Sequence, residues 1–173
     1  MKQIKWFDRK FDFSTQQNIF PGIIERLEGT PLRLLEKIKG VSAEKAVWKP
    51  DGKWSIAENI GHLSDLEPLW QARAHDILAG KKELTPTDLA NTKTDLANHN
   101  LKSLPQLIAE FTALRTETMS LLSGLQEEDV FRSALHPRLQ TPMRILDLFI
   151  FTADHDDHHL AQITALKKEG FMS

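Results

Sequence analysis

The stretch Phe151-Thr-Ala-Asp-His155-Asp-Asp-His158-His159-Leu-Ala-Gln162, near the C-terminus, places His155 and His159 four residues apart. On an α-helix this spacing stacks two side chains on one face, one turn apart. Two imidazoles placed in this way are within reach of a single metal ion. The segment therefore predicts a helix and a candidate metal site on one of its faces.

The histidine pair occupies the helix face that is expected to look into the core. The residues on that face follow one another at steps of three and four, and they are Ile145, Leu148, Thr152, His155, His159, Gln162 and Leu166. Such periodicity is typical of an amphipathic helix. Burying two adjacent imidazoles without partners costs on the order of several kcal/mol, and a metal ion would satisfy both.

The composition is that of an ordinary globular chain. It has 173 residues and a formal net charge of −2, so we expect one domain, residues 1–173, with no attraction to nucleic acid or to a membrane surface. No apolar run is long enough to cross a bilayer and the first residues lack an apolar signal core, so the expected location is the cytoplasm.

Cysteine and tyrosine are both absent, which excludes disulfides, thiolate ligands and a phenolic acid or base. Thiol chemistry would need a thiol from a cosubstrate.

Periodicity and capping signals predict an all-α fold, a four-helix bundle with an N-terminal arm and short extra helices. The expected elements are an aromatic arm at 1–14, a short helix at 19–28, and main helices at Thr30–Gly40, Ser55–Ala79, Ser103–Leu121 and Thr141–Gly170. No segment shows convincing strand alternation.

Local signals add detail to this prediction. Gly29 is expected to break the first helix, after which Thr30 caps the next helix and Pro31 opens it. Pro68 predicts a kink in the middle of its helix. Residues 80–102 are polar and loop-like, with room for a short helix.

His62 provides a third candidate ligand. It lies on a mostly apolar stripe of the second main helix, and it meets His155 and His159 inside the bundle if the second and fourth helices are neighbours. Three neutral histidines leave an ion at least one open position, where a water or a thiol could be acidified. All-nitrogen ligation suits zinc, nickel, iron(II) or cobalt. The alternative is a cluster of hydrogen-bonded core histidines that binds no metal.

Two segments resemble the DinB/YfiT-like superfamily of metal-binding four-helix bundles. They are Trp54-Ser-Ile-Ala-Glu-Asn-Ile-Gly-His62-Leu, at the start of the second main helix, and Ala153-Asp-His155-Asp-Asp-His-His159-Leu-Ala-Gln-Ile163 in the last one. The loop His136-Pro-Arg-Leu139, followed by Thr141-Pro-Met143, resembles the YfiT-like branch. The likeness extends over essentially the whole chain.

This resemblance implies that His62, His155 and His159 occupy the three metal positions of the family. Members are described as metal-dependent hydrolases, or as S-transferases and isomerases that use bacillithiol, mycothiol or glutathione. The implied cofactor is one divalent transition metal ion: zinc or nickel, with iron, cobalt or manganese as alternatives. The implied partners are a small-molecule thiol with an electrophile, or a small hydrolysable substrate.

Several polar residues flank the three histidines. Gln162 could hydrogen-bond a metal-bound water or substrate, or pair with another helix. Asp65 or Glu58 could orient His62 through its second ring nitrogen, although Ser55 and Glu58 also form a capping box, which we favour for Glu58. Asp156 lies nearest the histidine face and could contact His155 or His159, but we expect it to be solvated together with its acidic neighbours.

Other candidates are weaker. Arg138, in a loop, could bind a carboxylate or phosphate, or form a structural salt bridge. His158 points about 100° away from the histidine face and is not counted as a ligand, and His75 and His99 are expected at the surface. The tryptophans are expected to pack in the core and the arm rather than to form a recognition surface; they are Trp6, Trp48, Trp54 and Trp70.

The sequence leaves three functional hypotheses open. The first is a metal-dependent enzyme that transfers a thiol or hydrolyses a bond; transfer is slightly favoured, since no residue is an obvious general base, although Asp65 or Glu58 could fill that role. The second is a non-enzymatic bundle that binds a metal or a ligand in a stress response. The third is a purely structural bundle. Nucleic-acid binding is disfavoured, and a homodimer is compatible with exposed helix faces.

Overall fold

Four long helices make up most of the computed structural model, which describes residues 3–50 and 52–169. They are α1 (Phe20–Ile38), α3 (Ile56–Leu78), α5 (Leu104–Ser123) and α6 (Ile145–Glu169). The shorter elements are η1 (Trp6–Asp8), α2 (Ala43–Val47), α4 (Thr92–Leu96), η2 (His99–Leu101), η3 (Asp129–Phe131), β1 (Ser133–Leu135) and β2 (Pro142–Arg144).

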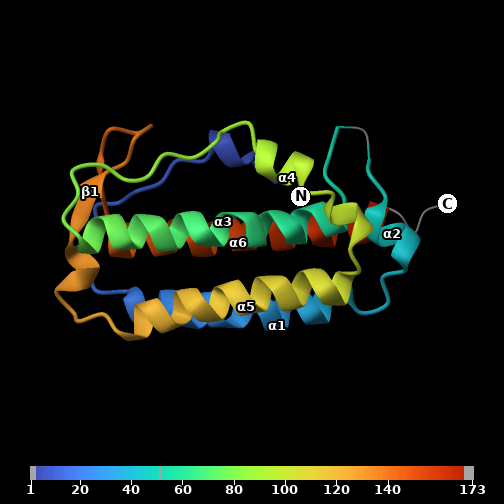
Figure 1. Ribbon diagram of the computed structural model, residues 1–173, viewed down its shortest axis with the longest axis horizontal. Helices are drawn as coiled ribbons and strands as arrows, with labels where there is room; N and C mark the ends of the chain where they lie inside the picture. Colours follow the sequence, from blue (N-terminus) through green and yellow to red (C-terminus); the bar gives the residue numbers. More distant parts are fainter. Residues whose placement is uncertain (1–2, 51, 170–173) are drawn as a thin grey trace.

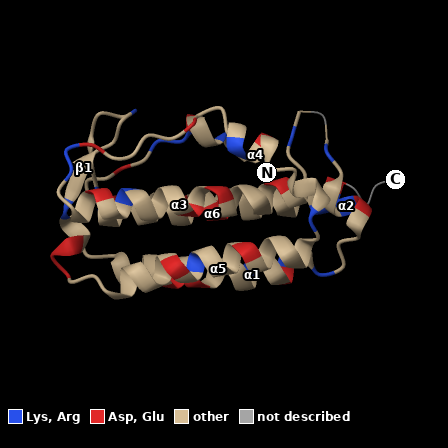
Figure 2. Cartoon of the chain, in the orientation of Figure 1, with Lys and Arg blue, Asp and Glu red and all other residues tan. Residues whose placement is uncertain are grey.

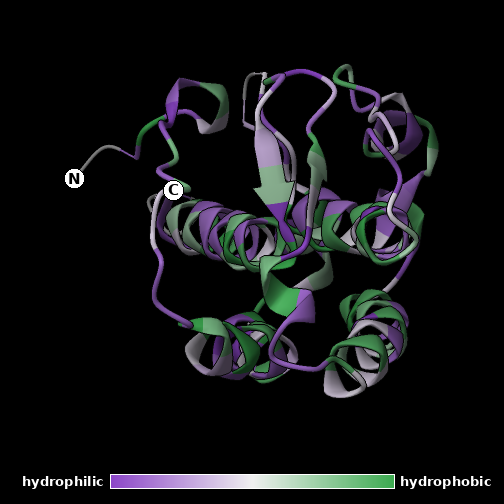
Figure 3. Cartoon of the chain, turned by 90° about the vertical axis from the view of Figure 1, so that its left-hand side faces the viewer, coloured by the Kyte–Doolittle hydropathy of each residue, from purple (hydrophilic) through white to green (hydrophobic). Residues whose placement is uncertain are grey.

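The long helices form two layers, with α3 beside α6 and α5 beside α1 (Figure 1). The α3 helix packs against α5 and α6, and α1 packs against the same two helices, so α1 and α3 lie across a diagonal. Seen end on, the helices form two pairs, with the β1–β2 hairpin above the α3–α6 pair (Figure 3). The three-histidine prediction required α3 and α6 to be neighbours, and they are.

Capping residues set the helix ends that the sequence predicted. Ser55 caps α3 in a full capping box with Glu58, and Ser103 caps α5 by accepting a hydrogen bond from Gln106 N. Beyond α3, Gly80 has a φ of 70°, a left-handed conformation that glycine adopts without steric cost. The predicted end of α6 at Gly170 lies outside the described residues.

The predicted break at Gly29 is wrong, because α1 runs unbroken through Gly29, Thr30 and Pro31. Thr30 is not an N-cap: its hydroxyl contacts Arg26 O at 3.1 Å and Asp156 Oδ2 at 2.8 Å. Packing against α5 and α6 outweighs the one backbone hydrogen bond that a proline removes from a helix.

The predicted helix start at Thr141-Pro142 is also wrong. Pro142 lies in β2, which pairs antiparallel with β1 in the register Ala134 to Met143, and α6 begins three residues later at Ile145. The two strands of three residues are too short to show alternation in the sequence. Met143 is fully buried in the core, which anchors the hairpin on the bundle.

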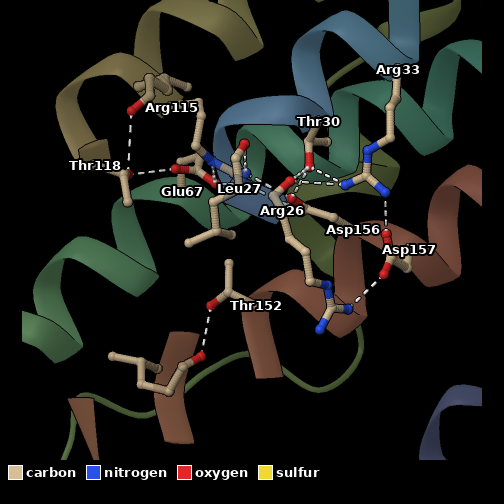
Figure 4. A network of polar contacts seen from close by, with 12 residues as sticks. Arg26, Leu27, Thr30, Arg33, Glu67, Arg115, Thr118, Thr152, Asp156 and Asp157 are labelled. Carbon is tan, nitrogen blue, oxygen red and sulfur yellow. Dashed lines mark hydrogen bonds and ion pairs between the residues drawn. The ribbon is translucent and has the colours of Figure 1, made fainter. Parts of the chain in front are cut away.

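A layer of buried polar side chains divides the core into two apolar clusters, one around Trp70 and Phe149 and one around Ile60 and Phe111. Each long helix contributes to this polar layer, which contains Thr30 of α1, Glu67 of α3, Arg115 and Thr118 of α5, and Asp156 of α6 (Figure 4). The Arg115 guanidinium pairs with Glu67 at 2.6 Å and with Asp156 at 2.7 Å. These contacts fix how the four helices sit against one another.

Charge is distributed over the chain without a dominant sign. In the view of Figure 2, basic and acidic residues are interspersed along the long helices. Among the described residues, no helix combines the length and the apolar character needed to cross a membrane.

Candidate metal centre

Three buried histidines converge between α3 and α6. One ligand atom from each of His62, His155 and His159 lies within 4.8 Å of those of the other two. The side chains are only 3%, 4% and 6% exposed, and the ring centroids are 4.5–5.2 Å apart. This is the cluster that the sequence predicted.

Thr94, in the middle of α4, sets the proton position on His62. The Thr94 hydroxyl lies 2.9 Å from Asp65 Oδ2, and it must donate there if the carboxylate is ionised. The same oxygen lies 2.9 Å from His62 Nδ1, so it accepts a hydrogen bond from a protonated Nδ1. The Nε2 atom of His62 then keeps its lone pair for a ligand.

Asn59 sets the proton position on His159. Its Nδ2 donates to the carbonyl of Ser55 at 2.7 Å, which identifies Oδ1 as the atom 2.8 Å from His159 Nδ1. A carbonyl oxygen can only accept, so the proton of His159 is on Nδ1 and its Nε2 keeps a lone pair. Two of the three rings are therefore held in the tautomer that a metal site needs.

His155 is held less tightly. Its Nε2 lies 3.2 Å from His159 Nε2, and its buried Nδ1 has no hydrogen-bond partner among the described residues. Trp6 of the N-terminal arm covers this ring edge-on, with centroids 5.0 Å apart. A metal ion bound by the three Nε2 atoms would replace the contact between two ring nitrogens with coordination bonds, so the donor set fits a metal.

Burial keeps these rings neutral. Desolvation lowers the pKa of His62 to about 4, and it lowers the pKa of His155 and of His159 well below the ordinary value of 6.5. Neutral imidazole is the form that binds metals. The site can thus accept a cation at neutral pH without first losing protons.

A cavity of about 320 Å³ opens beside the three histidines. Its walls include Trp6 from the arm, Trp54 just before α3 and Trp70 within α3. Trp70 belongs to the apolar core and Trp6 packs against it, as expected, and both rings border the cavity as well. Trp48 does not border the cavity, and it is 40% exposed.

The flanking residues take separate roles. Gln162 borders the cavity next to His159. Asp65 is joined to His62 by hydrogen bonds through Thr94, whereas Glu58 is engaged by the backbone of Ser55 and by Lys49. Arg138 is exposed and borders the cavity from the loop after β1.

Two expectations about surface residues are wrong. Asp156 is 1% exposed rather than solvated, since it pairs with Arg115. His99 is 4% exposed: its Nε2 lies 2.8 Å from Asp65, and its ring fills the space that a side chain at position 61 would need. A Cβ on Gly61 would lie 2.2 Å from that ring. His75 is exposed, as predicted.

Sequence reasoning missed the partners of the ligands. Asn59 was visible one turn before His62 on the same helix stripe, but its role depends on α6 lying alongside. Thr94 lies in the polar segment 80–102, and no local sequence signal indicates that this segment packs against α3.

The fold and the site together define the class of protein. The sequence matches the DinB superfamily over residues 26–163. Because this match covers most of the chain, the protein belongs to the DinB superfamily.

Solved structures share the fold. YfiT from Bacillus subtilis, described as a probable metal-dependent hydrolase with an unusual four-helix bundle topology, is 21% identical, with a TM-score of 0.81 and 95% of each chain covered. A protein from Streptococcus pneumoniae is 15% identical over 89% of this chain and 92% of that one, with a TM-score of 0.69. The colibactin self-resistance protein ClbS, solved with double-stranded DNA, is 13% identical over 89% of this chain and 98% of that one, with a TM-score of 0.66. A comparison with curated proteins finds no match.

Proposed function

We propose that this protein is a metal-dependent enzyme whose single metal ion is held by His62, His155 and His159. The observation that carries the proposal is the hydrogen bonding that leaves Nε2 of His62 and of His159 unprotonated, in a cluster whose ligand atoms all lie within 4.8 Å of one another. Three protein ligands leave a position for a reactant, where the ion supplies acidity to a water or a thiol.

The reaction proposed first is hydrolysis of a small substrate. The description of YfiT as a probable metal-dependent hydrolase supports this choice, together with the shared fold. The cavity has the volume of a small-molecule site and mostly apolar walls. These walls would exclude bulk water from the reacting atoms, and Gln162 would position the substrate by hydrogen bonding.

A second candidate is transfer of a low-molecular-weight thiol of the bacillithiol, mycothiol or glutathione type. The favouring observation is that Asp88 is the one carboxylate among the described cavity residues, and it already accepts from the backbone of Ala90 and Thr92. Asp65 is likewise engaged, by Thr94 and His99. A thiol needs a general base less than water does, because it is the stronger acid.

The donor set limits the choice of metal. Three imidazole nitrogens suit zinc or nickel, with iron, cobalt or manganese as alternatives. We propose small molecules rather than nucleic acid or membrane as partners, a single domain over residues 1–173, and a location in the cytoplasm. A non-enzymatic metal-binding or ligand-binding bundle, and a homodimer, remain alternative proposals.

The experiment that separates the two reactions is turnover with and without a thiol. The metal-loaded protein is incubated with activated esters alone, and with glutathione plus a chlorodinitrobenzene. Hydrolysis in water alone, lost in His155→Ala, supports a hydrolase. Product that appears only with thiol, and consumes it one for one, supports a transferase. No turnover in either assay, with metal bound, supports the non-enzymatic alternative.

A further inference from the structure

A buried arginine at the far end of the same cavity lacks an acceptor for its charge. Arg73 is 2% exposed, and its Nε donates to Thr85 O at 2.9 Å. Its Nη2 is buried without a hydrogen-bond partner among the described residues, none of which places a carboxylate within salt-bridge distance of Arg73. Buried charges are normally paired, so this guanidinium needs an explanation.

The apparent partner of Arg73 is not an acceptor. His136 Nε2 lies 3.4 Å from Arg73 Nη1, but His136 Nδ1 already accepts from the backbone N–H groups of Arg138 and Leu139, both at 3.2 Å. A neutral His136 therefore carries its proton on Nε2. Two donors then face each other, and neither satisfies the other.

Nearby acidic groups are committed elsewhere. Asp76 receives Thr85 N and Thr85 Oγ1, each at 2.7 Å, and pairs with Lys81 at 2.7 Å. Burial lowers the pKa of Arg73 to about 10, so the guanidinium stays charged at neutral pH. Burial, reinforced by Arg73 and Arg138, lowers the pKa of His136 to about 4, so that ring stays neutral.

Arg73, His136 and Arg138 all border the cavity that holds the three histidines. Arg73 and His136 are buried, and Arg138 lies exposed at the edge of the cavity. Trp70 lies between the histidine cluster and Arg73. Its ring is 5.9 Å from the ring of His155 and 5.8 Å from the guanidinium carbon of Arg73. A small molecule lying on Trp70 can therefore reach both ends.

We infer that Arg73 and His136 form a carboxylate-binding subsite, and that the ligand of this cavity is a small organic acid whose apolar body lies on Trp70. A carboxylate accepts two parallel hydrogen bonds from a guanidinium. It is preferred to a phosphate because its single charge matches the single buried positive charge. Carboxylate binding itself does not depend on a metal; only the identification of this ligand as the substrate rests on the proposed function.

The test is calorimetric titration of the protein, as purified and after chelation, with hexanoate, hexanamide and hexyl phosphate. The inference predicts that hexanoate binds both forms at least tenfold more tightly than hexanamide, and more tightly than hexyl phosphate. Arg73→Gln should lower hexanoate affinity at least tenfold. The matched control Arg132→Gln removes an exposed arginine that pairs with Asp129 and should leave binding unchanged.

Three outcomes would overturn the inference. Equal binding of hexanoate and hexanamide would remove the anion requirement, and tighter binding of hexyl phosphate would reassign the anion. Binding that needs the metal and survives Arg73→Gln would place the carboxylate on the ion instead. The ligand comparison in the wild-type protein stands even if Arg73→Gln fails to fold. Failure of the proposed metal enzyme would appear separately, as absence of bound metal or of turnover.

Discussion

The Nδ1 atom of His159 on α6 donates to Oδ1 of Asn59 on α3 at 2.8 Å, across the interface of the two helices that build the histidine cluster. This contact orients the imidazole and leaves its Nε2 unprotonated, with a lone pair directed into the histidine cluster. Both residues are buried, at 3% exposure for Asn59 and 6% for His159, so no bulk water replaces the bond. The helix interface and the metal chemistry therefore depend on the same hydrogen bond.

Asn59→Leu should lower metal affinity about 10- to 100-fold, the usual cost of losing a hydrogen bond behind a ligand histidine. The fold should persist, since leucine fills a similar volume. Competition with a chromophoric chelator measures the affinity, and Gln106→Leu, on the exposed face of α5, is the control. Unchanged affinity in Asn59→Leu would show that Asn59 does not orient the ligand.

Thr94→Val should have a comparable effect through His62. The substitution keeps the shape of the side chain but removes the hydroxyl that joins His62 Nδ1 to Asp65 Oδ2. We expect metal affinity to fall about 10-fold and stability to fall by about 1–3 kcal/mol, because the buried Nδ1 of His62 loses its hydrogen-bond partner and Asp65 keeps His99 but loses Thr94. Thr94→Ser retains the hydroxyl and should restore both values. Equal loss in the serine variant would point to packing instead.

Asp156→Ala should destabilise the bundle by about 3–5 kcal/mol, because it leaves the buried Arg115 with one counter-charge fewer. The neighbouring Asp157, whose side chain is 40% exposed, pairs with Arg26 and Arg33 near solvent. Asp157→Ala should cost less than about 1 kcal/mol. Urea unfolding compares the two variants, and similar losses would contradict the structural role given to the polar layer.

Stability of the chelated protein should fall as the pH drops from about 6.5 towards 4. An unfolded histidine titrates near 6.5, whereas the pKa of His62 in the fold is lowered to about 4, so in this window the unfolded chain binds the extra proton. The stability from this residue is fully present above pH 6.5 and is lost on acidification, by up to about 3 kcal/mol. His62→Leu should show a shallower pH dependence in urea unfolding, and an unchanged slope would contradict this assignment.

Features with a local sequence signal could be predicted. The i, i+4 spacing of His155 and His159 and the capping box at Ser55 depend only on helix geometry, and both are present in the structure. The bundle followed from the length and periodicity of its helices. The superfamily followed from motifs around His62 and His159, and the match over residues 26–163 confirms it.

Features that depend on contacts between distant segments could not be predicted. In the sequence, Asp156 resembles part of an acidic surface, because its partner Arg115 comes from α5 and only the fold brings the two together. Proline and glycine in α1 signal a break, which tertiary packing overrides. His99 looks isolated because its partner Asp65 lies 34 residues earlier in the chain.

The central claim is that three histidines hold one metal ion, and elemental analysis of untagged protein tests it most directly. We expect about one equivalent of a transition metal in the wild type. That metal should be lost in His62→Ala, His155→Ala and His159→Ala, and kept in His158→Ala. Metal retained in any of the first three variants, or a wild type that takes up neither zinc nor nickel, would contradict it.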